Sequence, residues 1–146
     1  MPQRDAIHDT VKQALSKDGW EITDDPYVIS YGERFLFVDL GATETGTGKG
    51  RFIGAQLHGK RIAVEVKNFR SRSPILDLEK AIGQYMLYRL LLDKVDPERE
   101  IWLAVTDKVY DGIFSEPVGE LAVSELPIKL IVINSEKAEV QKWITP

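Results

Sequence analysis

Cysteine is absent from the 146-residue sequence, which excludes disulfide bonds, zinc sites built on thiolates and a thiol nucleophile. No segment approaches the roughly 20 apolar residues that a membrane-spanning helix needs, and the N-terminal stretch MPQRDAIHDTVKQAL contains no long apolar run. An excess of positive charge is also absent, because the net charge is −4. These absences predict a soluble, cytoplasmic protein. Any contact with nucleic acid should be local, metal-assisted or aided by a partner.

The composition that is present predicts one domain. Hydrophobic residues make up 43% of the chain, enough for a single packed core over residues 1–146, and no repeat or linker divides it. A Gly-rich segment, GATETGTGKG, occupies positions 41–50. It is not a Walker loop, because its Gly-Lys pair is followed by Gly50, and it is not a dinucleotide fingerprint, because Arg51 stands where a third glycine is needed. We interpret it as a surface hairpin loop, whose Lys49 and Arg51 could touch a phosphate backbone.

The hydrophobic periodicity predicts a mixed α/β order. Ser73 is the expected N-cap of the longest helix, with Pro74 at its first position. A short, fully apolar segment at 101–105 is typical of a strand inside a sheet. The pattern indicates an α/β sandwich with a central mixed β-sheet flanked by helices. Helices are expected at 4–17, 75–94, 107–114 and 118–123, and strands at 27–31, 35–40, 51–57, 61–67, 101–105, 129–133 and 139–144.

Two opposite charges interrupt the expected strand in IAVEVKNF. Side chains alternate along a strand, so Glu65 and Lys67 share one face, about 6.6 Å apart along it. A carboxylate that holds a divalent cation, beside an ammonium that neutralises developing charge, suits phosphodiester chemistry. The alternative is an amphipathic strand with a solvated Glu/Lys face.

A second carboxylate, Asp39, ends the apolar strand expected in FLFVDLGA. Aspartate is unfavourable inside strands, and the alternative here is a turn-forming residue just before Gly41. Asp39 and Glu65, with the carbonyl of Val66, would supply oxygen ligands suited to Mg²⁺ or Mn²⁺.

Gln84 and Tyr85, in AIGQYMLY, lie midway along the longest expected helix. A helix that follows the Glu-x-Lys strand packs across it, so Gln84 could hydrogen-bond the lysine, a metal-bound water or a phosphate. The alternatives are a surface glutamine and a tyrosine that fills the core.

The arrangement Asp39, Glu65-Val66-Lys67 and Gln84-Tyr85 resembles the PD-(D/E)XK endonuclease-like superfamily. A closer resemblance covers nearly the whole chain. The segments that carry it are DAIHDTVKQALSKDGWEITDDPY, FVDLGA, IAVEVKNF, GQYMLYRLLL, EPVG, KLIVIN and KWI. They resemble the XisH family, the fdxN element excision controlling factors of cyanobacteria.

The resemblance implies a restriction-endonuclease-like sandwich and a role in programmed, site-specific excision of a DNA element. A dedicated recombinase and a companion factor, XisI, are the implied partners. It assigns Asp39 and Glu65 to the metal carboxylates, Lys67 to the catalytic lysine and Gln84 to the helix glutamine of resolvase-like members. Asp5, His8 and Asp9 match the opening motif of the family, and could add a ligand or proton carrier or be a plain helix surface.

The sequence departs from the expected pattern in three places. Val38 replaces the proline that names the superfamily motif, and the loop over 43–50 is longer than expected. Gln56 stands where a glutamate is expected, which puts a further carboxylate there in doubt. Two function classes stay open: a metal-dependent nuclease, and a noncatalytic accessory that binds DNA or protein and directs a recombinase. An acidic factor acting on DNA is expected to work as a homodimer or with a basic partner.

Overall fold

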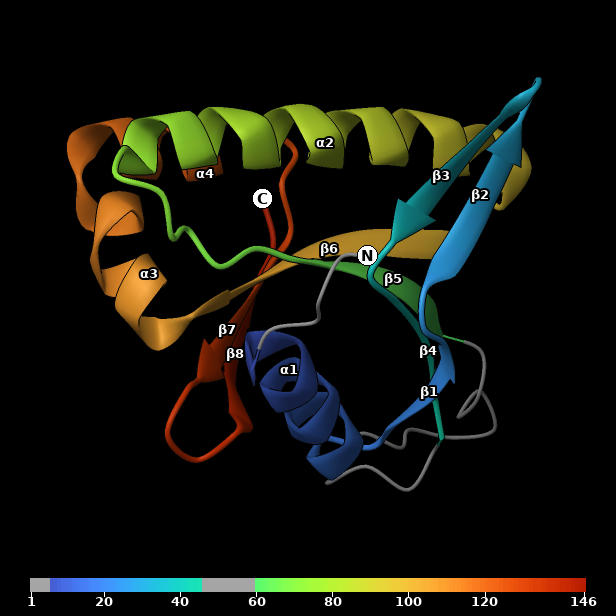
Figure 1. The fold of residues 1–146 in the computed structure, drawn as a ribbon, viewed down its shortest axis with the longest axis horizontal. Helices are drawn as coiled ribbons and strands as arrows, with labels where there is room; N and C mark the ends of the chain where they lie inside the picture. Colours follow the sequence, from blue (N-terminus) through green and yellow to red (C-terminus); the bar gives the residue numbers. More distant parts are fainter. Residues whose placement is uncertain (1–5, 46–59) are drawn as a thin grey trace.

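The computed structural model describes residues 6–45 and 60–146, and within them a curled mixed sheet carries helices on both faces (Figure 1). The sheet has six strands in the order β1-β4-β5-β6-β7-β8, and β2 and β3 form a separate two-stranded sheet. The two pairs β5–β6 and β6–β7 are parallel and the other pairs are antiparallel. The helices are α1 (Ala6–Lys17), α2 (Pro74–Val95), α3 (Asp107–Asp111) and α4 (Pro117–Glu125), with a 3₁₀ turn at Ile113–Ser115. The strands are β1 (Trp20–Asp24), β2 (Tyr27–Tyr31), β3 (Arg34–Val38), β4 (Leu40–Glu44), β5 (Arg61–Val66), β6 (Arg99–Thr106), β7 (Leu130–Asn134) and β8 (Glu139–Ile144).

The element order is confirmed with three corrections. The single strand expected at 35–40 is wrong, because the chain bends at Asp39, where it stops pairing with β2 and begins to pair with β1 and β5. The helix expected at 107–114 is wrong beyond Asp111, because Gly112 caps it and a 3₁₀ turn follows. Strand β1 was not expected. The strand expected at 51–57 and the loop residues from 46 onward lie outside the described residues.

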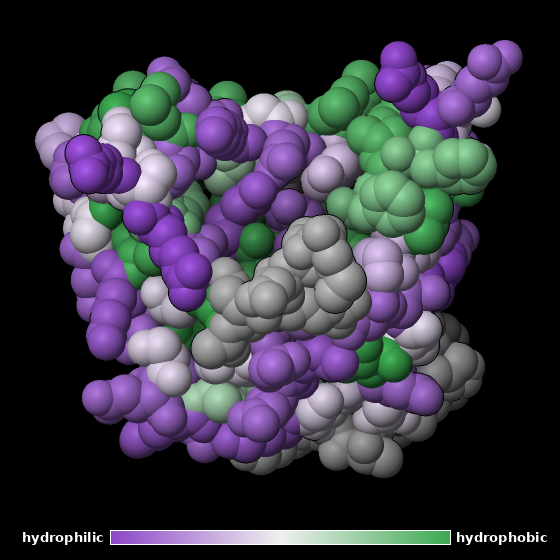
Figure 2. Space-filling view, in the orientation of Figure 1, coloured by the Kyte–Doolittle hydropathy of each residue, from purple (hydrophilic) through white to green (hydrophobic). Residues whose placement is uncertain are grey.

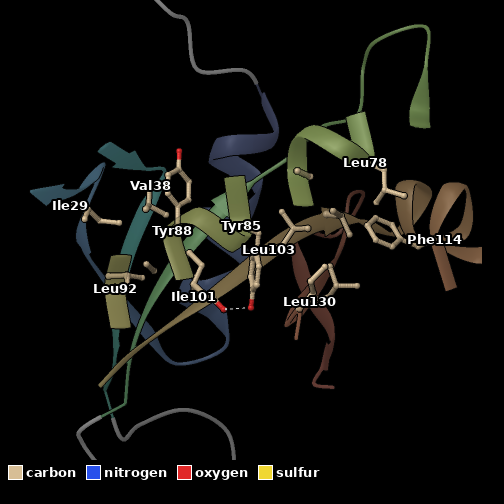
Figure 3. Packing of buried hydrophobic residues seen from close by; sticks show 14 of the residues in the cluster. Ile29, Val38, Leu78, Tyr85, Tyr88, Leu92, Ile101, Leu103, Phe114 and Leu130 are labelled. Carbon is tan, nitrogen blue, oxygen red and sulfur yellow. Dashed lines mark hydrogen bonds between the residues drawn. The ribbon is translucent and has the colours of Figure 1, made fainter. Parts of the chain in front are cut away.

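The two faces of the sheet pack against different helices. On β5, Ile62 and Val64 join a cluster with α1, whereas Ala63 joins a cluster with α2, shown in Figure 3. The same alternation continues along β6, where Leu103 faces α2 and Trp102 faces α1. The alternation of side chains expected from the sequence is therefore confirmed, and it directs Glu65, two residues after Ala63, toward α2.

The sheet curls around α1. Trp20 belongs to β1 and Trp143 to β8, at opposite edges of the six-stranded sheet, yet their ring centroids are 5.6 Å apart. Trp102, in the central strand β6, meets Trp143 edge-on with centroids 4.8 Å apart. Contact between the two edge strands requires strong curvature toward the face that α1 covers.

Helix α2 begins as its sequence predicts. The Ser73 side chain accepts a hydrogen bond from the Leu76 N–H at 3.3 Å, and Pro74 occupies the first turn, where a missing N–H has no effect on the helical hydrogen bonds. None of the helices in the described ranges is long and apolar enough to span a membrane.

Asp96, just after α2, connects three elements. Its two carboxylate oxygens each accept a hydrogen bond from the Arg61 guanidinium at 3.0 Å, at the start of β5. One of them also accepts from Arg99 Nε at 3.1 Å, at the start of β6. The Arg99 guanidinium lies over the Tyr27 ring, 4.4 Å from its centroid. One carboxylate therefore holds the end of α2 against the beginnings of both central parallel strands.

Candidate active site

The bend at Asp39 brings the first carboxylate against the end of β5. Asp39 Oδ2 accepts a hydrogen bond from the Val66 N–H at 2.8 Å. The carboxylate is therefore fixed beside Glu65 and Lys67, which flank Val66 in the chain. The alternative interpretation, a turn-forming aspartate, is compatible with this geometry. Asp39 lies at the bend of the chain and its side chain also accepts the Val66 hydrogen bond.

Glu65 is buried, so the alternative of a solvated Glu/Lys face is wrong for this residue. Its exposed fraction is 5%, and one of its carboxylate oxygens, Oε2, lies 3.4 Å from Lys67 Nζ. The other, Oε1, is buried and has no hydrogen-bond partner among residues 6–45 and 60–146. A buried oxygen without a partner is unfavourable unless a cation, a water or a substrate completes its contacts.

Burial is the main reason that the pKa of Glu65 rises to about 7, and the negative charge of Asp39 raises it further. The nearby Lys67 ammonium opposes this rise and does not cancel it. The site therefore holds two carboxylates that repel one another in the absence of a cation. Near neutral pH, Glu65 can carry or release a proton.

Tyr88 belongs to the same electrostatic environment, although the sequence patterns did not single it out. Burial, followed by the charges of Glu65 and Asp39, raises the pKa of Tyr88 to about 12. Its hydroxyl stays protonated at neutral pH and can donate a hydrogen bond toward the carboxylates. A signal for it does exist in the sequence, because Tyr88 stands four residues after Gln84 and so lies on the same side of a helix.

Helix α2 presents Gln84 and Tyr85 in different surroundings. Gln84 is partly buried, and its Oε1 has no hydrogen-bond partner in the described part of the chain. Tyr85 is buried: its hydroxyl donates to the Ile101 carbonyl and accepts from the Lys129 N–H, both at 3.0 Å. Figure 3 shows Tyr85 and Tyr88 extending from α2 in different directions. Tyr85 thus joins α2 to the sheet, whereas Gln84 keeps a free acceptor.

The residues of the opening motif lie in different places. His8 Nε2 donates to Asp25 Oδ1 at 2.9 Å, and Lys12 Nζ donates to the other oxygen of Asp25 at 2.8 Å. This pairing fixes α1 to the residues between β1 and β2. Asp9 is exposed on α1. Asp5 lies outside the described residues, as do Lys49, Arg51 and Gln56.

The donor set at Asp39 and Glu65 fits a hard divalent cation. Two neighbouring carboxylates, one with a buried unpartnered oxygen, are ligands that Mg²⁺ and Mn²⁺ prefer. Within the described ranges, no three His, Asp or Glu side chains come together as a metal-binding group. Backbone oxygen and water would complete such a shell, which is usual for Mg²⁺.

Glu65→Gln should stabilise the metal-free protein at pH 8 and have little effect at pH 5. The folded pKa of Glu65, about 7, lies above the ordinary value of 4.5, so folding favours its protonated form. This contribution is fully present below pH 4.5 and is lost as the pH rises through 7. We expect a gain of about 2 kcal/mol at pH 8, or several degrees in Tm, measured by thermal and urea unfolding with EDTA.

The matched control for that experiment is Glu79→Gln, an exposed glutamate on α2, which should change stability little at either pH. A Glu65→Gln protein less stable than the wild type at pH 8 would mean that the Glu65–Lys67 pair is a structural salt bridge.

Comparison with known proteins identifies the family. The family model described as XisH protein matches residues 1–141. The crystal structure of an XisH family protein from Nostoc punctiforme is similar, with 34% identity and a TM-score of 0.83, and the match covers 97% of this chain and 100% of that one. That of an fdxN element excision controlling factor protein from Anabaena variabilis has 36% identity, a TM-score of 0.82 and the same coverage. No curated protein matches the sequence. From the family model and these two structures, the chain belongs to the XisH family.

Proposed function

We propose that this chain is an excision controlling factor for a programmed, site-specific DNA excision, and that it carries a PD-(D/E)XK-type, metal-dependent nuclease-like site. The observation that carries the proposal is the hydrogen bond between Asp39 and Val66, which holds Asp39 beside the buried Glu65 and its neighbour Lys67. The curled mixed sheet with α1 and α2 on opposite faces supports assignment to the restriction-endonuclease-like sandwich. The excision role is supported by the similarity to the Anabaena variabilis protein, which is an fdxN element excision controlling factor.

Asp39 and Glu65, with the Val66 carbonyl, would hold Mg²⁺ or Mn²⁺. When bound, the cation would polarise a phosphodiester and lower the pKa of a nucleophilic water. Lys67, 3.4 Å from Glu65, places an ammonium where it can neutralise charge that develops on the phosphate. Gln84 can orient a nucleophilic water, because its Oε1 remains an acceptor without a partner in the described chain, and its amide NH2 could donate to a phosphate oxygen.

DNA would approach over the loop that follows β5, which is positively charged although the chain is acidic. Arg70 and Arg72 are exposed, and neither forms an ion pair or hydrogen bond within the residues that the structure describes. The loop has an internal anchor, because the Phe69 ring lies against Phe114 with centroids 5.8 Å apart. Ser71 is fixed through its N–H, which donates to Asp77 Oδ2 at 3.1 Å. Two exposed arginines on a fixed loop, directly after Lys67, suit contacts with a phosphate backbone.

Arg70→Ala/Arg72→Ala should weaken DNA binding about tenfold or more at low salt, with little dependence on DNA sequence. Removing one arginine–phosphate contact should reduce the slope of log affinity against log salt by about 1, so the double variant should lower it by about 2. Fluorescence anisotropy over a salt series measures both quantities.

The control for the arginine pair is Lys94→Ala/Lys137→Ala, which changes net charge equally at exposed positions on the end of α2 and in the β7–β8 turn. Equal decreases in affinity for the two double variants would assign the effect to overall charge and count against the loop as a DNA-binding surface.

The alternative is a noncatalytic accessory that uses the same surface to bind DNA or protein and directs a recombinase. The observation that favours it is the donor set, which includes only two carboxylates and no third acidic or histidine ligand among the described residues. Under either function, we expect an XisI-like companion factor and a site-specific recombinase as partners. A nicking assay on supercoiled and branched DNA, with manganese and with EDTA, distinguishes the two functions.

A further inference from the structure

The β2–β3 hairpin carries apolar side chains on both of its faces. On the inner face, Ile29 and Val38 are buried in the cluster with α2. On the outer face, Val28 pairs with Phe37, and Phe35 follows on the same side. An antiparallel strand pair with one open face normally alternates apolar and polar residues, and apolar residues on both faces are typical of sheets covered on both sides. The sequence of the hairpin therefore fits a covered outer face.

In the single chain, that outer face is open. Phe35 is 66% exposed, Phe37 is 57% exposed and Val28 is 46% exposed. Figure 2 shows them as a green, hydrophobic patch over the hairpin that projects at the upper right of Figure 1. A hollow of about 400 Å³ lies between the hairpin tip and α2, on the inner side of the hairpin, and Phe35 borders it. The residues that line this hollow are Tyr31, Arg34, Phe35, Leu36, Leu87 and Leu91.

We propose that a second copy of this chain covers the outer face of the β2–β3 hairpin. With about 200 Å² for a fully exposed aromatic side chain, the open apolar surface of Val28, Phe35 and Phe37 on the outer face amounts to roughly 300 Å². Stable dimers bury roughly 800 Å² on each partner, with an apolar centre and a polar rim. The patch is therefore large enough to be the apolar centre of a dimer interface with a polar rim around it, and it is in the size range in which an exposed apolar patch is often functional.

The charge pattern of the patch suits a copy of itself. Val28, Ser30, Phe35 and Phe37 are uncharged, and the nearest charges on the hairpin, Glu33 and Arg34, lie at its tip. A twofold axis places a surface against itself, so an uncharged centre brings no like charges together. Two such faces can stack about 10 Å apart, as packed sheets do, and the small Ser30 leaves room for an aromatic ring of the other copy. A nucleic acid would require cations that this face does not have.

This interface goes beyond the proposed function and does not depend on a metal site. It would also have a consequence for that site, because β3 leads directly into Asp39. The dimer would hold the Asp39 bends of the two copies at a fixed distance and orientation. An enzyme or clamp that acts on both strands of a duplex requires such a fixed arrangement.

Sedimentation velocity over a concentration series tests the proposal, with Phe35→Ser/Phe37→Ser as the variant. We expect the wild type to be a dimer at micromolar concentration and the double variant to dissociate at least about 100-fold more readily. The control is Leu121→Ser on α4, equally apolar and 61% exposed, which should leave the dimer intact. Circular dichroism and Tm establish that each variant is folded. A wild type that is monomeric at every concentration overturns the proposal and leaves the face to another protein or to a lipid surface.

A second measurement keeps the proposal testable if the double variant does not fold. Because the chain has no cysteine, Ser30→Cys introduces a single thiol at the proposed interface. A bismaleimide reagent that spans about 10 Å should cross-link this variant to a dimer, whereas Ser124→Cys, exposed on α4, should remain a monomer on a denaturing gel. Equal cross-linking of the two variants, or a dimer that persists in the Phe35→Ser/Phe37→Ser protein, would also overturn the proposal.

Discussion

Lys67→Met should reduce manganese-dependent nicking of supercoiled DNA by at least about 100-fold, the usual decrease when a group that stabilises transition-state charge is removed. Methionine retains most of the length and apolar character of the lysine stem and removes the ammonium. Glu65→Gln should cause a decrease of similar size, because it keeps the shape of the side chain and removes a ligand charge. The initial rate of conversion of supercoiled to open-circular DNA measures both effects.

The control for Lys67→Met is Lys80→Met, an exposed lysine on α2, which should retain wild-type nicking. Binding of DNA should persist in Lys67→Met, since Arg70 and Arg72 remain. A folded Lys67→Met protein that nicks at the wild-type rate would contradict the nuclease proposal. A wild type that binds DNA but cuts none of the substrates with any divalent metal would favour the noncatalytic accessory.

Asp96→Ala should lower the free energy of unfolding by about 3 kcal/mol, because it leaves two partly buried guanidinium groups without their carboxylate. The Asp96 side chain is 19% exposed and that of Arg99 is 8% exposed, so water is a poor substitute for the missing hydrogen bonds. Without Asp96, Arg61 no longer has a two-point partner, and the end of α2 is no longer connected to β5 and β6. Urea unfolding at pH 7 measures the change in the free energy of unfolding. Thermal unfolding at the same pH should show a decrease in Tm of roughly 10 °C.

The matched control is Glu98→Ala, since Glu98 lies 3.7 Å from the same Arg61 but its side chain is 86% exposed. Its removal should change stability by less than about 1 kcal/mol.

The difference in stability between the wild type and Asp96→Ala should shrink in acid, whereas the small difference for Glu98→Ala should not show this loss. Desolvation acts to raise the pKa of Asp96, but hydrogen bonds from Arg99 and Arg61 outweigh it and hold the pKa below 3.8. Its contribution is present above pH 3.8 and is lost as the pH falls through the folded pKa. Equal effects of the two variants at pH 7 would contradict this account.

Much of the fold could be predicted because short-range patterns determine it. Alternation along β5 was enough to place Ile62 and Val64 on one face and Ala63 and Glu65 on the other. Ser73 followed by Pro74 was enough to predict where α2 begins. The XisH resemblance, carried by segments spread over the chain, is confirmed by the family model and by two similar structures. The PD-(D/E)XK assignment, the metal and the partners remain predictions.

Part of the candidate site could not be predicted from periodicity. Gln84, Tyr85 and Tyr88 all belong to one helix, and the rotation of α2 about its axis decides which of them lies near the carboxylates, as Tyr88 does. That rotation depends on packing against β6 and β7, where the Tyr85 hydroxyl bonds to Ile101 and Lys129. Tyr88 was therefore missed, although it shares a helix side with Gln84.

The amino-acid sequence alone was sufficient for the mixed α/β order, the start of α2, the alternation of β5 and the family. The first three features depend on backbone preferences, on caps and on contacts within a few residues of the chain, whereas the family follows from motifs spread along the sequence. Three-dimensional packing was needed to establish that the chain bends at Asp39, that Glu65 is buried, and that Arg70 and Arg72 form no ion pair within the described residues. Each of these depends on which segments far apart in the chain come together, as in the Asp39–Val66 hydrogen bond. Such contacts set the local solvation and charge, and these decide whether a carboxylate is a surface group or part of a site.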